Sequence, residues 1–279
     1  MNTNQALSEL LVDVDWVAER LDDASVRLVE VDVSRAAYDQ GHIPGTVLWN
    51  AYTDLRHPDY SPIGTAELER LLSASGIDPE TCVVFHGYGA HLGLWLLRSH
   101  GHERVRLLDG RREDWPDAGY RWSLDAPAPP VSSYRLAPAD SRLQPSRAEV
   151  QAMVGRPDRV ILDVRSQAEY DGERFWPSGA TEGAGRAGHI PGSVHLPIER
   201  LRSEDGRFRD PDEMRRALDE RGVTPDRRVV AYCTIGNRAS QAWFALNHLL
   251  DHPDAGVYYG SWAEWGSLPD TPVESGFRR

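Results

Sequence analysis

One cysteine lies where a nucleophile could work. Cys233 directly follows the short apolar run 229–232. The residues Thr234-Ile235-Gly236-Asn237-Arg238 lead from it into a helical segment. A short loop that closes onto a helix N-terminus directs several backbone N–H groups inward. Such a loop stabilises an anion, so it favours the reactive thiolate form of a cysteine. Arg238 adds a fixed positive charge at the start of the helix.

The second cysteine, Cys82, precedes the apolar run of its own strand, and no comparable loop follows it. The usual role of a lone cysteine is that of a small, buried, unreactive side chain. We therefore interpret Cys82 as structural, and the strand–loop–helix context identifies Cys233 as the candidate nucleophile. Two cysteines alone make neither a metal site nor a disulfide framework.

The elements that must position Cys233 occur twice along the chain. Gly-His-Ile-Pro-Gly stands at 41–45 and again at 188–192, an offset of 147. We interpret these turns as architectural, because glycine and proline set tight backbone geometry. Apolar runs at 26–32 and 159–164 resemble buried parallel strands. Helical patterns occur in both halves, at 66–73, 92–97, 212–221 and 239–250. This alternation predicts an α/β fold with two parallel sheets, each flanked by helices.

The repeat also shows how the halves differ. An offset of 147 aligns His86 with Cys233, whereas an offset of 146 aligns it with Tyr232, so the register is known to within one residue. In either register the first half has no cysteine at the end of its second strand. Ligands of open α/β sheets bind beyond the carboxyl ends of the strands, and only the second half has a thiol there.

Five prolines and little periodicity mark 125–145 as an extended linker. We predict a first domain at 1–124 and a second at 146–279, both of ordinary domain size. Ser146, with Glu149 three positions later, predicts a capping box where the second domain begins.

The second half carries an insertion at 172–187 that is rich in glycine and contains Phe175, Trp176 and Arg186. A flap over a site and an ordinary surface insertion are both open interpretations.

Composition excludes several function classes. Asp and Glu number 43 against 31 basic residues, all of them arginine, for a net charge of −12. Without lysine there is no Schiff-base chemistry, and an acidic chain without a basic run is a poor nucleic-acid binder. Segment 1–15 lacks the features of a secretory signal, and no apolar stretch is long enough to span a membrane. We expect a cytoplasmic protein with neither nucleic acid nor membrane as a partner.

The joint pattern resembles the tandem-domain rhodaneses, which are thiosulfate and 3-mercaptopyruvate sulfurtransferases. The resemblance covers nearly the whole chain. It rests on both Gly-His-Ile-Pro-Gly turns, Asp163-Val164-Arg165-Ser166, the loop from Cys233 to Arg238, and Gly260-Ser261-Trp262-Ala263-Glu264-Trp265. It implies two rhodanese-like domains, of which the N-terminal one is inactive and the C-terminal one carries a cysteine persulfide.

The family mechanism implies a role for each matching residue. The thiolate of Cys233 attacks the outer sulfur of thiosulfate, and a thiophilic acceptor, cyanide or a thiol, then removes that sulfur. The expected partners are thus a small anionic donor and this acceptor, with no metal and no organic cofactor. Arg165 matches the arginine that holds an anionic donor, although a surface ion pair is its alternative role. The other expected substrate-binding residues are Thr234, Ile235, Gly236, Asn237 and Arg238. The candidate accessory residues are Asp163, Arg186 and His86.

The sequence of the cysteine loop indicates the sulfur donor less clearly than it indicates the nucleophile. Thiosulfate-type loops usually carry cationic side chains where this chain has Thr234 and Ile235. Mercaptopyruvate-type loops usually read Cys-Gly-Ser-Gly, and that serine is absent here. The ending on Arg238 resembles a bacterial thiosulfate-type subgroup with Cys-Arg-Ile-Gly-Glu-Arg. We favour thiosulfate, because a dianion would gain from two arginines, with 3-mercaptopyruvate as the alternative.

Two further functional classes fit this sequence less well. Cys-based phosphatases also use a cysteine loop that ends in arginine, but the four residues between Cys233 and Arg238 are one fewer than in those enzymes. A non-enzymatic sulfur carrier or regulatory module would keep the fold but would not require the cysteine or the arginine. The physiological acceptor and the oligomeric state do not follow from the sequence.

Overall fold

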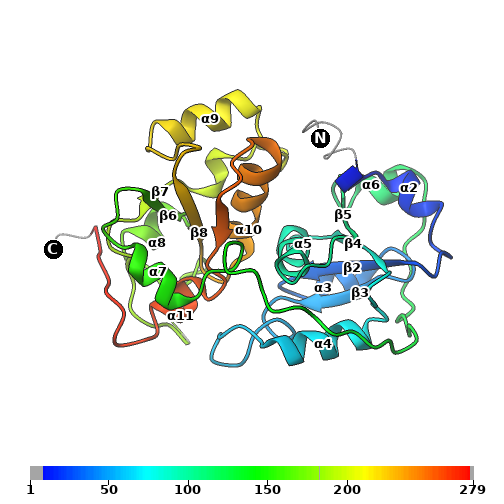
Figure 1. The fold of residues 1–279 in the computed structure, drawn as a ribbon. Coiled ribbons are helices and arrows are strands. Elements are labelled where there is room, and N and C mark those ends of the chain that lie inside the picture. Colours follow the sequence, from blue (N-terminus) through cyan, green and yellow to red (C-terminus); the bar gives the residue numbers. More distant parts are fainter. Residues whose placement is uncertain (1–8, 182, 277–279) are drawn as a thin grey trace. The chain divides into compact units, whose positions relative to one another are not determined.

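The structure is a computed structural model that describes residues 9–181 and 183–276 (Figure 1). The chain divides into two compact units. The first comprises Met1–Pro58 and Pro62–Ala139, and the second comprises Asp59–Ser61 and Asp140–Arg279.

The first unit contains a five-stranded parallel sheet in the order β1-β5-β4-β2-β3. Its central strands are mostly buried apolar residues, as expected for parallel strands that are covered on both faces. The strands are β1 (Leu11–Val12), β2 (Val26–Asp32), β3 (Val47–Asn50), β4 (Cys82–His86) and β5 (Val105–Leu108). The helices are α2 (Val14–Ala18), α3 (Ala36–Gln40), α4 (Thr65–Ala74), α5 (Ala90–Ser99) and α6 (Asp114–Asp117).

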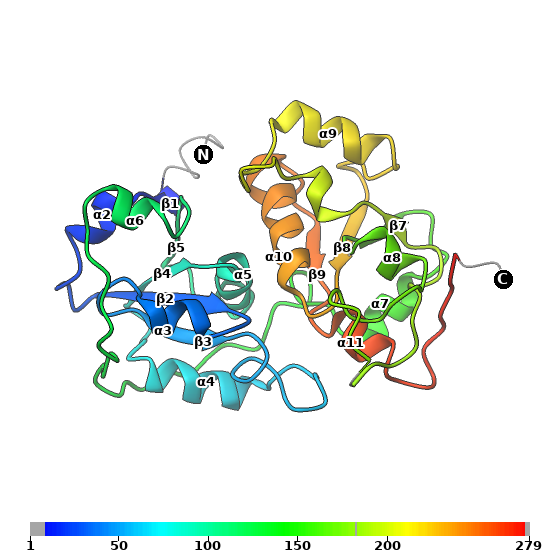
Figure 2. The same ribbon diagram turned by 180° about the vertical axis from the view of Figure 1, so that it is seen from behind.

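The second unit repeats this plan with a four-stranded parallel sheet in the order β7-β6-β8-β9. Figure 2 shows α10 beside β8 and β9. The strands are β6 (Arg159–Asp163), β7 (Val194–His195), β8 (Arg228–Tyr232) and β9 (Ala255–Val257). The helices are α7 (Arg147–Met153), α8 (Gln167–Tyr170), η1 (Ile198–Arg200), α9 (Pro211–Asp219), α10 (Asn237–Phe244), η2 (Ala245–Leu249) and α11 (Ser261–Trp265). The predicted α/β fold with two helix-flanked parallel sheets is confirmed.

The predicted helices are present with small differences at their ends. The helical pattern at 239–250 is α10, which begins at Asn237, followed by a π-helical turn, η2. The capping box is also present: the Ser146 hydroxyl accepts from the Glu149 N–H, and the Glu149 carboxylate accepts from the Ser146 N–H at 2.7 Å. This reciprocal pair satisfies donors at the start of α7.

The strand ladders settle the register between the two halves. The last pair between β2 and β4 is Glu30 with His86, and the last pair between β6 and β8 is Asp163 with Tyr232. His86 therefore corresponds to Tyr232, and Gly87 takes the place of Cys233. Of the two registers that the repeat allowed, the offset of 146 holds at this edge.

The two Gly-His-Ile-Pro-Gly turns make the same contacts. His42 stacks on Tyr38 with ring centroids 3.8 Å apart, and His189 stacks on Tyr170 at 3.7 Å. The backbone of each histidine pairs with a distant strand-like segment, at Ser123 in the first unit and at Glu274 in the second. Both histidines therefore have architectural contacts.

The segment 125–145 contains no helix or strand. Its first part is bonded to the first unit, since the Ser132 N–H donates to the Ser73 carbonyl at 3.1 Å and the Leu136 N–H donates to Glu69 at 3.0 Å. Near residue 140 the partners change, and the Leu143 carbonyl accepts from the Val257 N–H of β9 at 2.8 Å. Among the described residues, no helix is long and apolar enough to cross a membrane.

Candidate active site

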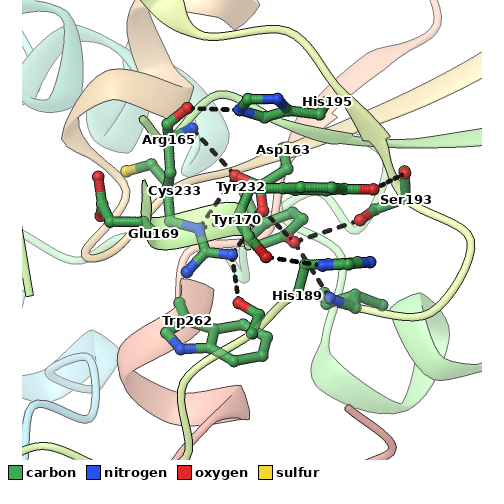
Figure 3. Close-up of polar contacts among 12 residues, drawn as sticks. Asp163, Arg165, Glu169, Tyr170, His189, Ser193, His195, Tyr232, Cys233 and Trp262 are labelled. Carbon is green, nitrogen blue, oxygen red and sulfur yellow. Dashed lines mark hydrogen bonds and ion pairs between the residues drawn. The ribbon is translucent and has the colours of Figure 1, made fainter. Parts of the chain in front are cut away.

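Cys233 lies at the carboxyl end of β8, in the four-residue loop that leads into α10 (Figure 3). Its side chain is only 1% exposed, and the Gly236 N–H donates to its Sγ at 3.1 Å. Gly236 has a φ of 91°, and a Cβ there would lie 3.0 Å from the ring of Tyr259. The loop therefore needs glycine at this position to aim an amide at the sulfur.

The first turn of α11 holds the beginning of the loop. The N–H groups of Trp262 and Ala263 donate to the carbonyls of Cys233 and Thr234, each at 2.9 Å. The Cys233 N–H donates to the Ser261 hydroxyl at 3.3 Å. Ser261 itself has a φ of 55°, a strained conformation for a serine. These bonds tie the nucleophile to the start of α11.

A buried ion pair braces the loop from the other side. Arg238 donates to both oxygens of Glu169 at 2.8 Å, and the Thr234 hydroxyl donates to the same carboxylate at 2.7 Å. Burial by itself would raise the pKa of Glu169, but the Arg238 and Thr234 bonds lower it to about 2. Arg238 is thus bonded to protein groups at the place where the sequence suggested a donor-binding arginine.

Arg165 forms a second buried ion pair beneath the loop. Its guanidinium, which is fully buried, lies 2.6 Å from the Asp163 carboxylate and donates to the Gly188 carbonyl at 2.7 Å. It also lies over the Trp262 ring, 4.5 Å from the centroid. Burial opposes the charge, but Asp163 raises the pKa of Arg165 above its ordinary value. The alternative of a surface ion pair therefore does not describe this arginine.

One nitrogen of this guanidinium has no bond to protein. Arg165 Nη1 is buried and without a hydrogen-bond partner in the described part of the chain, as are both polar atoms of the Asn237 side chain. Unpaired buried donors cost free energy. The two nitrogens among them, Arg165 Nη1 and Asn237 Nδ2, are therefore donors whose hydrogen-bonding capacity is unused.

Tyr232 completes the support of Asp163. Its hydroxyl donates to the Asp163 carboxylate and accepts from the Ile190 N–H at 3.2 Å. Burial and the neighbouring carboxylate raise the pKa of Tyr232 well above its ordinary value, so the hydroxyl stays protonated. Figure 3 shows Tyr232, Asp163 and Arg165 joined in one network of hydrogen bonds.

Arg186 contacts the end of α11 and the segment that follows it, rather than the cysteine loop. Its guanidinium donates to the Thr271 carbonyl at 2.8 Å and to the Thr271 hydroxyl at 2.6 Å, and its carbonyl accepts from the Trp262 indole at 3.1 Å. The aromatic residues of the same insertion, Phe175 and Trp176, are buried. The insertion is therefore anchored to the helix that carries Trp262.

His86 lies in the first unit, at the position that corresponds to Tyr232. Its imidazole lies 3.2 Å from the Thr46 hydroxyl and 3.9 Å from Glu30. Among the described residues, no group of three or more His, Cys, Asp or Glu side chains could hold a metal ion.

Three supporting residues were not among the sequence-predicted site residues: Glu169, Tyr232 and Ser261. Of these, only Glu169 could have been noticed in the sequence, because Ser166 and Glu169 have the spacing of a capping box. That capping box is present at the start of α8. The sequence does not indicate that the same carboxylate also reaches Thr234 and Arg238.

Comparisons with known proteins agree with this arrangement. A family model described as "Rhodanese-like domain" matches residues 13–118 and again residues 146–268. The chain belongs to the rhodanese family. It carries two rhodanese domains in tandem, and the family is one of sulfurtransferases.

Several relatives match along the whole tandem rhodanese chain. A Haloferax volcanii protein named "Putative thiosulfate sulfurtransferase" is 36% identical over 99% of this chain and 100% of its own. The "Sulfur carrier protein TtuD" of Thermus thermophilus is 36% identical over 96% of this chain and 97% of its own.

Solved structures with the same fold also match this chain. An anaerobic ergothioneine biosynthesis enzyme from Chlorobium limicola, in complex with trimethyl histidine, has a TM-score of 0.84 at 27% identity. The match covers 97% of this rhodanese chain and 71% of that enzyme. A variant of EanB, another similar structure with a TM-score of 0.85, is described as a cysteine persulfide with ergothioneine.

Proposed function

We propose that this protein is a thiosulfate sulfurtransferase that moves a sulfane sulfur to cyanide or a thiol through a persulfide on Cys233. The observation that carries the proposal is the hydrogen bond from the Gly236 N–H to Cys233 Sγ, at 3.1 Å, within a loop that two buried networks hold in place. An amide aimed at sulfur stabilises negative charge there, whether on the thiolate or on the persulfide.

The proposed reaction has two displacements. The thiolate of Cys233 attacks the outer sulfur of thiosulfate, the sulfur–sulfur bond of the donor breaks, and its electron pair leaves with sulfite. The persulfide anion then transfers its outer sulfur to the acceptor, and the electron pair of the breaking bond restores the thiolate. With cyanide the product is thiocyanate, so atoms and charge balance without a redox co-reactant.

The buried charges suit an anionic donor. Arg165 is held rigidly by Asp163, and its unpaired Nη1 can donate to an oxygen of the donor. Arg238 is neutralised by Glu169, so its main contribution is to the shape of the loop. We assign Arg165 to the donor and Arg238 to positioning.

A second function, sulfur carriage to another protein, is favoured by the 36% identity to a protein named as a sulfur carrier. It uses the same persulfide and differs in the acceptor. The related alternative, 3-mercaptopyruvate as donor, differs only in the first displacement. Steady-state rates with thiosulfate and with 3-mercaptopyruvate, each with cyanide and with a thiol as acceptor, separate these alternatives.

The decisive experiment is intact-mass spectrometry after incubation with thiosulfate. We expect one added sulfur, about 32 Da, which cyanide removes. Cys233→Ser should abolish the adduct, and the matched control Cys82→Ser should retain it. An adduct that stays in Cys233→Ser and disappears in Cys82→Ser would overturn the assignment of the nucleophile.

A further inference from the structure

The first unit has its own cavity at the carboxyl ends of its strands. Its volume is about 210 Å³, and its lining includes residues from the ends of β2, β4 and β5. This is the edge at which Cys233 lies in the second unit. Neither the proposed sulfur transfer nor the supporting networks of Cys233 use this cavity.

The cavity cannot act as a second persulfide site. Gly87 replaces the cysteine, and the loop Gly87-Tyr88-Gly89 is one residue shorter than the loop before α10. The Gly89 N–H donates to the Val31 carbonyl at 2.7 Å, so it is unavailable to an anion. The charged and apolar side chains that line the cavity therefore need an explanation other than persulfide chemistry.

Charged groups nevertheless lie at this edge. The Glu30 side chain is 3% exposed, and Arg112 Nη1 lies 3.2 Å from its carboxylate. Arg112 also donates to the Gly41 carbonyl, just as Arg165 donates to the corresponding Gly188 carbonyl. An ion pair that buries a carboxylate, with its arginine 30% exposed, contributes little net stability compared with apolar packing. Its presence beside an open cavity is therefore better explained by a ligand than by folding alone.

The charges of the lining balance. Glu30 and Asp32 are negative, and Arg111 and Arg112 are positive, with Arg112 paired to Glu30 and Arg111 paired to Asp114. Burial lowers the pKa of His86 to about 3, so its ring is neutral and adds no charge. A dianion such as thiosulfate would face two carboxylates, and a simple cation would face two guanidinium groups. A ligand with both charges and no net charge avoids both penalties.

Four large apolar side chains also line the cavity. Ile43 and Trp115 are 2% and 1% exposed, and Leu108 and Trp122 also belong to the lining. Such walls favour the burial of a hydrocarbon or thioether group, because apolar area removed from water lowers the free energy.

We propose that this cavity binds an amino-acid-sized zwitterion with an apolar side chain. Glu30 and Asp32 accept the ammonium group, Arg111 donates to the carboxylate, and Trp115 and Trp122 contact the side chain. The site is separate from Cys233 and does not depend on the proposed sulfur transfer.

The test is isothermal titration of the full-length protein with L-methionine and two analogues that each lack one charge. 4-(Methylthio)butanoate lacks the ammonium group, and 3-(methylthio)propylamine lacks the carboxylate. We expect saturable binding of methionine and binding of each analogue that is at least about tenfold weaker, because each analogue loses one of the two charge-assisted contacts. Equal binding of all three, or no saturable binding of methionine, would overturn the proposal.

Two variants locate the binding. Arg111→Glu should weaken methionine binding at least about tenfold, because its side chain is 58% exposed and the reversal places a third carboxylate at the cavity. Arg104→Glu is the matched control, since it reverses an exposed charge of the same unit outside the lining and should bind as wild type does. Leu108→Trp, which fills the cavity, should abolish binding while its circular dichroism stays native. Wild-type affinity in both Arg111→Glu and Leu108→Trp would show that methionine binds elsewhere and would refute the site.

Discussion

At the scale of single residues, Glu169 is the carboxylate that connects the cysteine loop to α8. Its pKa in the folded protein is about 2, below the ordinary 4.5, because Arg238 and Thr234 bond to the ionised form against the cost of burial. A lowered pKa stabilises the fold above pH 4.5, and the stabilisation is lost as pH falls from 4.5 towards 2. This stabilisation amounts to about 3 kcal/mol in the free energy of unfolding.

The measurement is the free energy of unfolding in urea at several pH values between neutral and about 3, where Glu169 begins to bind its proton. Glu169→Gln should lower stability at neutral pH and should flatten the acid dependence. A pH profile of Glu169→Gln that is parallel to that of wild type would show that the ion pair with Arg238 does not govern stability.

Substitution of Arg165 can be followed in two independent quantities, the free energy of unfolding and the KM for thiosulfate. Because the Arg165 side chain is fully buried against Asp163, Arg165→Ala leaves that carboxylate without its charged partner. We expect a loss of about 3 to 5 kcal/mol in the free energy of unfolding. Arg207→Ala, at an exposed arginine, is the control and should change stability by less than about 0.5 kcal/mol. Unchanged stability with a raised KM for thiosulfate would instead make Arg165 a purely donor-binding residue.

At the scale of elements, the turn from β8 into α10 depends on the backbone of Gly236. Gly236→Ala should lower stability and slow persulfide formation, because φ is 91° and the new Cβ would meet Tyr259 at 3.0 Å. Gly206→Ala is a matched control: its φ is 82°, but nothing lies within 4 Å of the added Cβ. It should cost about 1 kcal/mol and leave the rate unchanged. Stopped-flow measurement of sulfite release compares the two, and equal rates would remove Gly236 from the mechanism.

At the scale of the whole molecule, the two halves keep one fold but only one reactive loop. Gly87→Cys in the Cys82→Ser background restores a thiol at the position that corresponds to Cys233. It should not restore a second sulfur acceptor, because the loop is one residue short and the Gly89 N–H is bonded to Val31. Intact mass after thiosulfate treatment should rise by about 32 Da and not by about 64 Da. A second cyanide-removable sulfur would show that the cysteine alone decides which half is active.

Sequence alone was sufficient for the features that are local or repeated. The alternation of apolar runs and helical patterns determined the α/β fold, because that alternation reflects which residues must be buried. The repeated turns revealed the duplication, and the spacing of Ser146 and Glu149 revealed a helix start. Cys233 could be identified as the candidate nucleophile because its context of strand, short loop and helix is contiguous in the chain.

Tertiary structure decided every relation between distant segments. The Glu169 carboxylate reaches the loop 65 residues later, at Thr234. Arg112 occupies beside Glu30 the role that Arg165 has beside Asp163, although the two arginines come from different places in their domains. Side-chain partners across a sheet edge depend on strand order and packing, which the local sequence pattern does not encode. The amino-acid sequence by itself thus determined the fold, the duplication and the candidate nucleophile, and only folding in three dimensions determined which charges surround it.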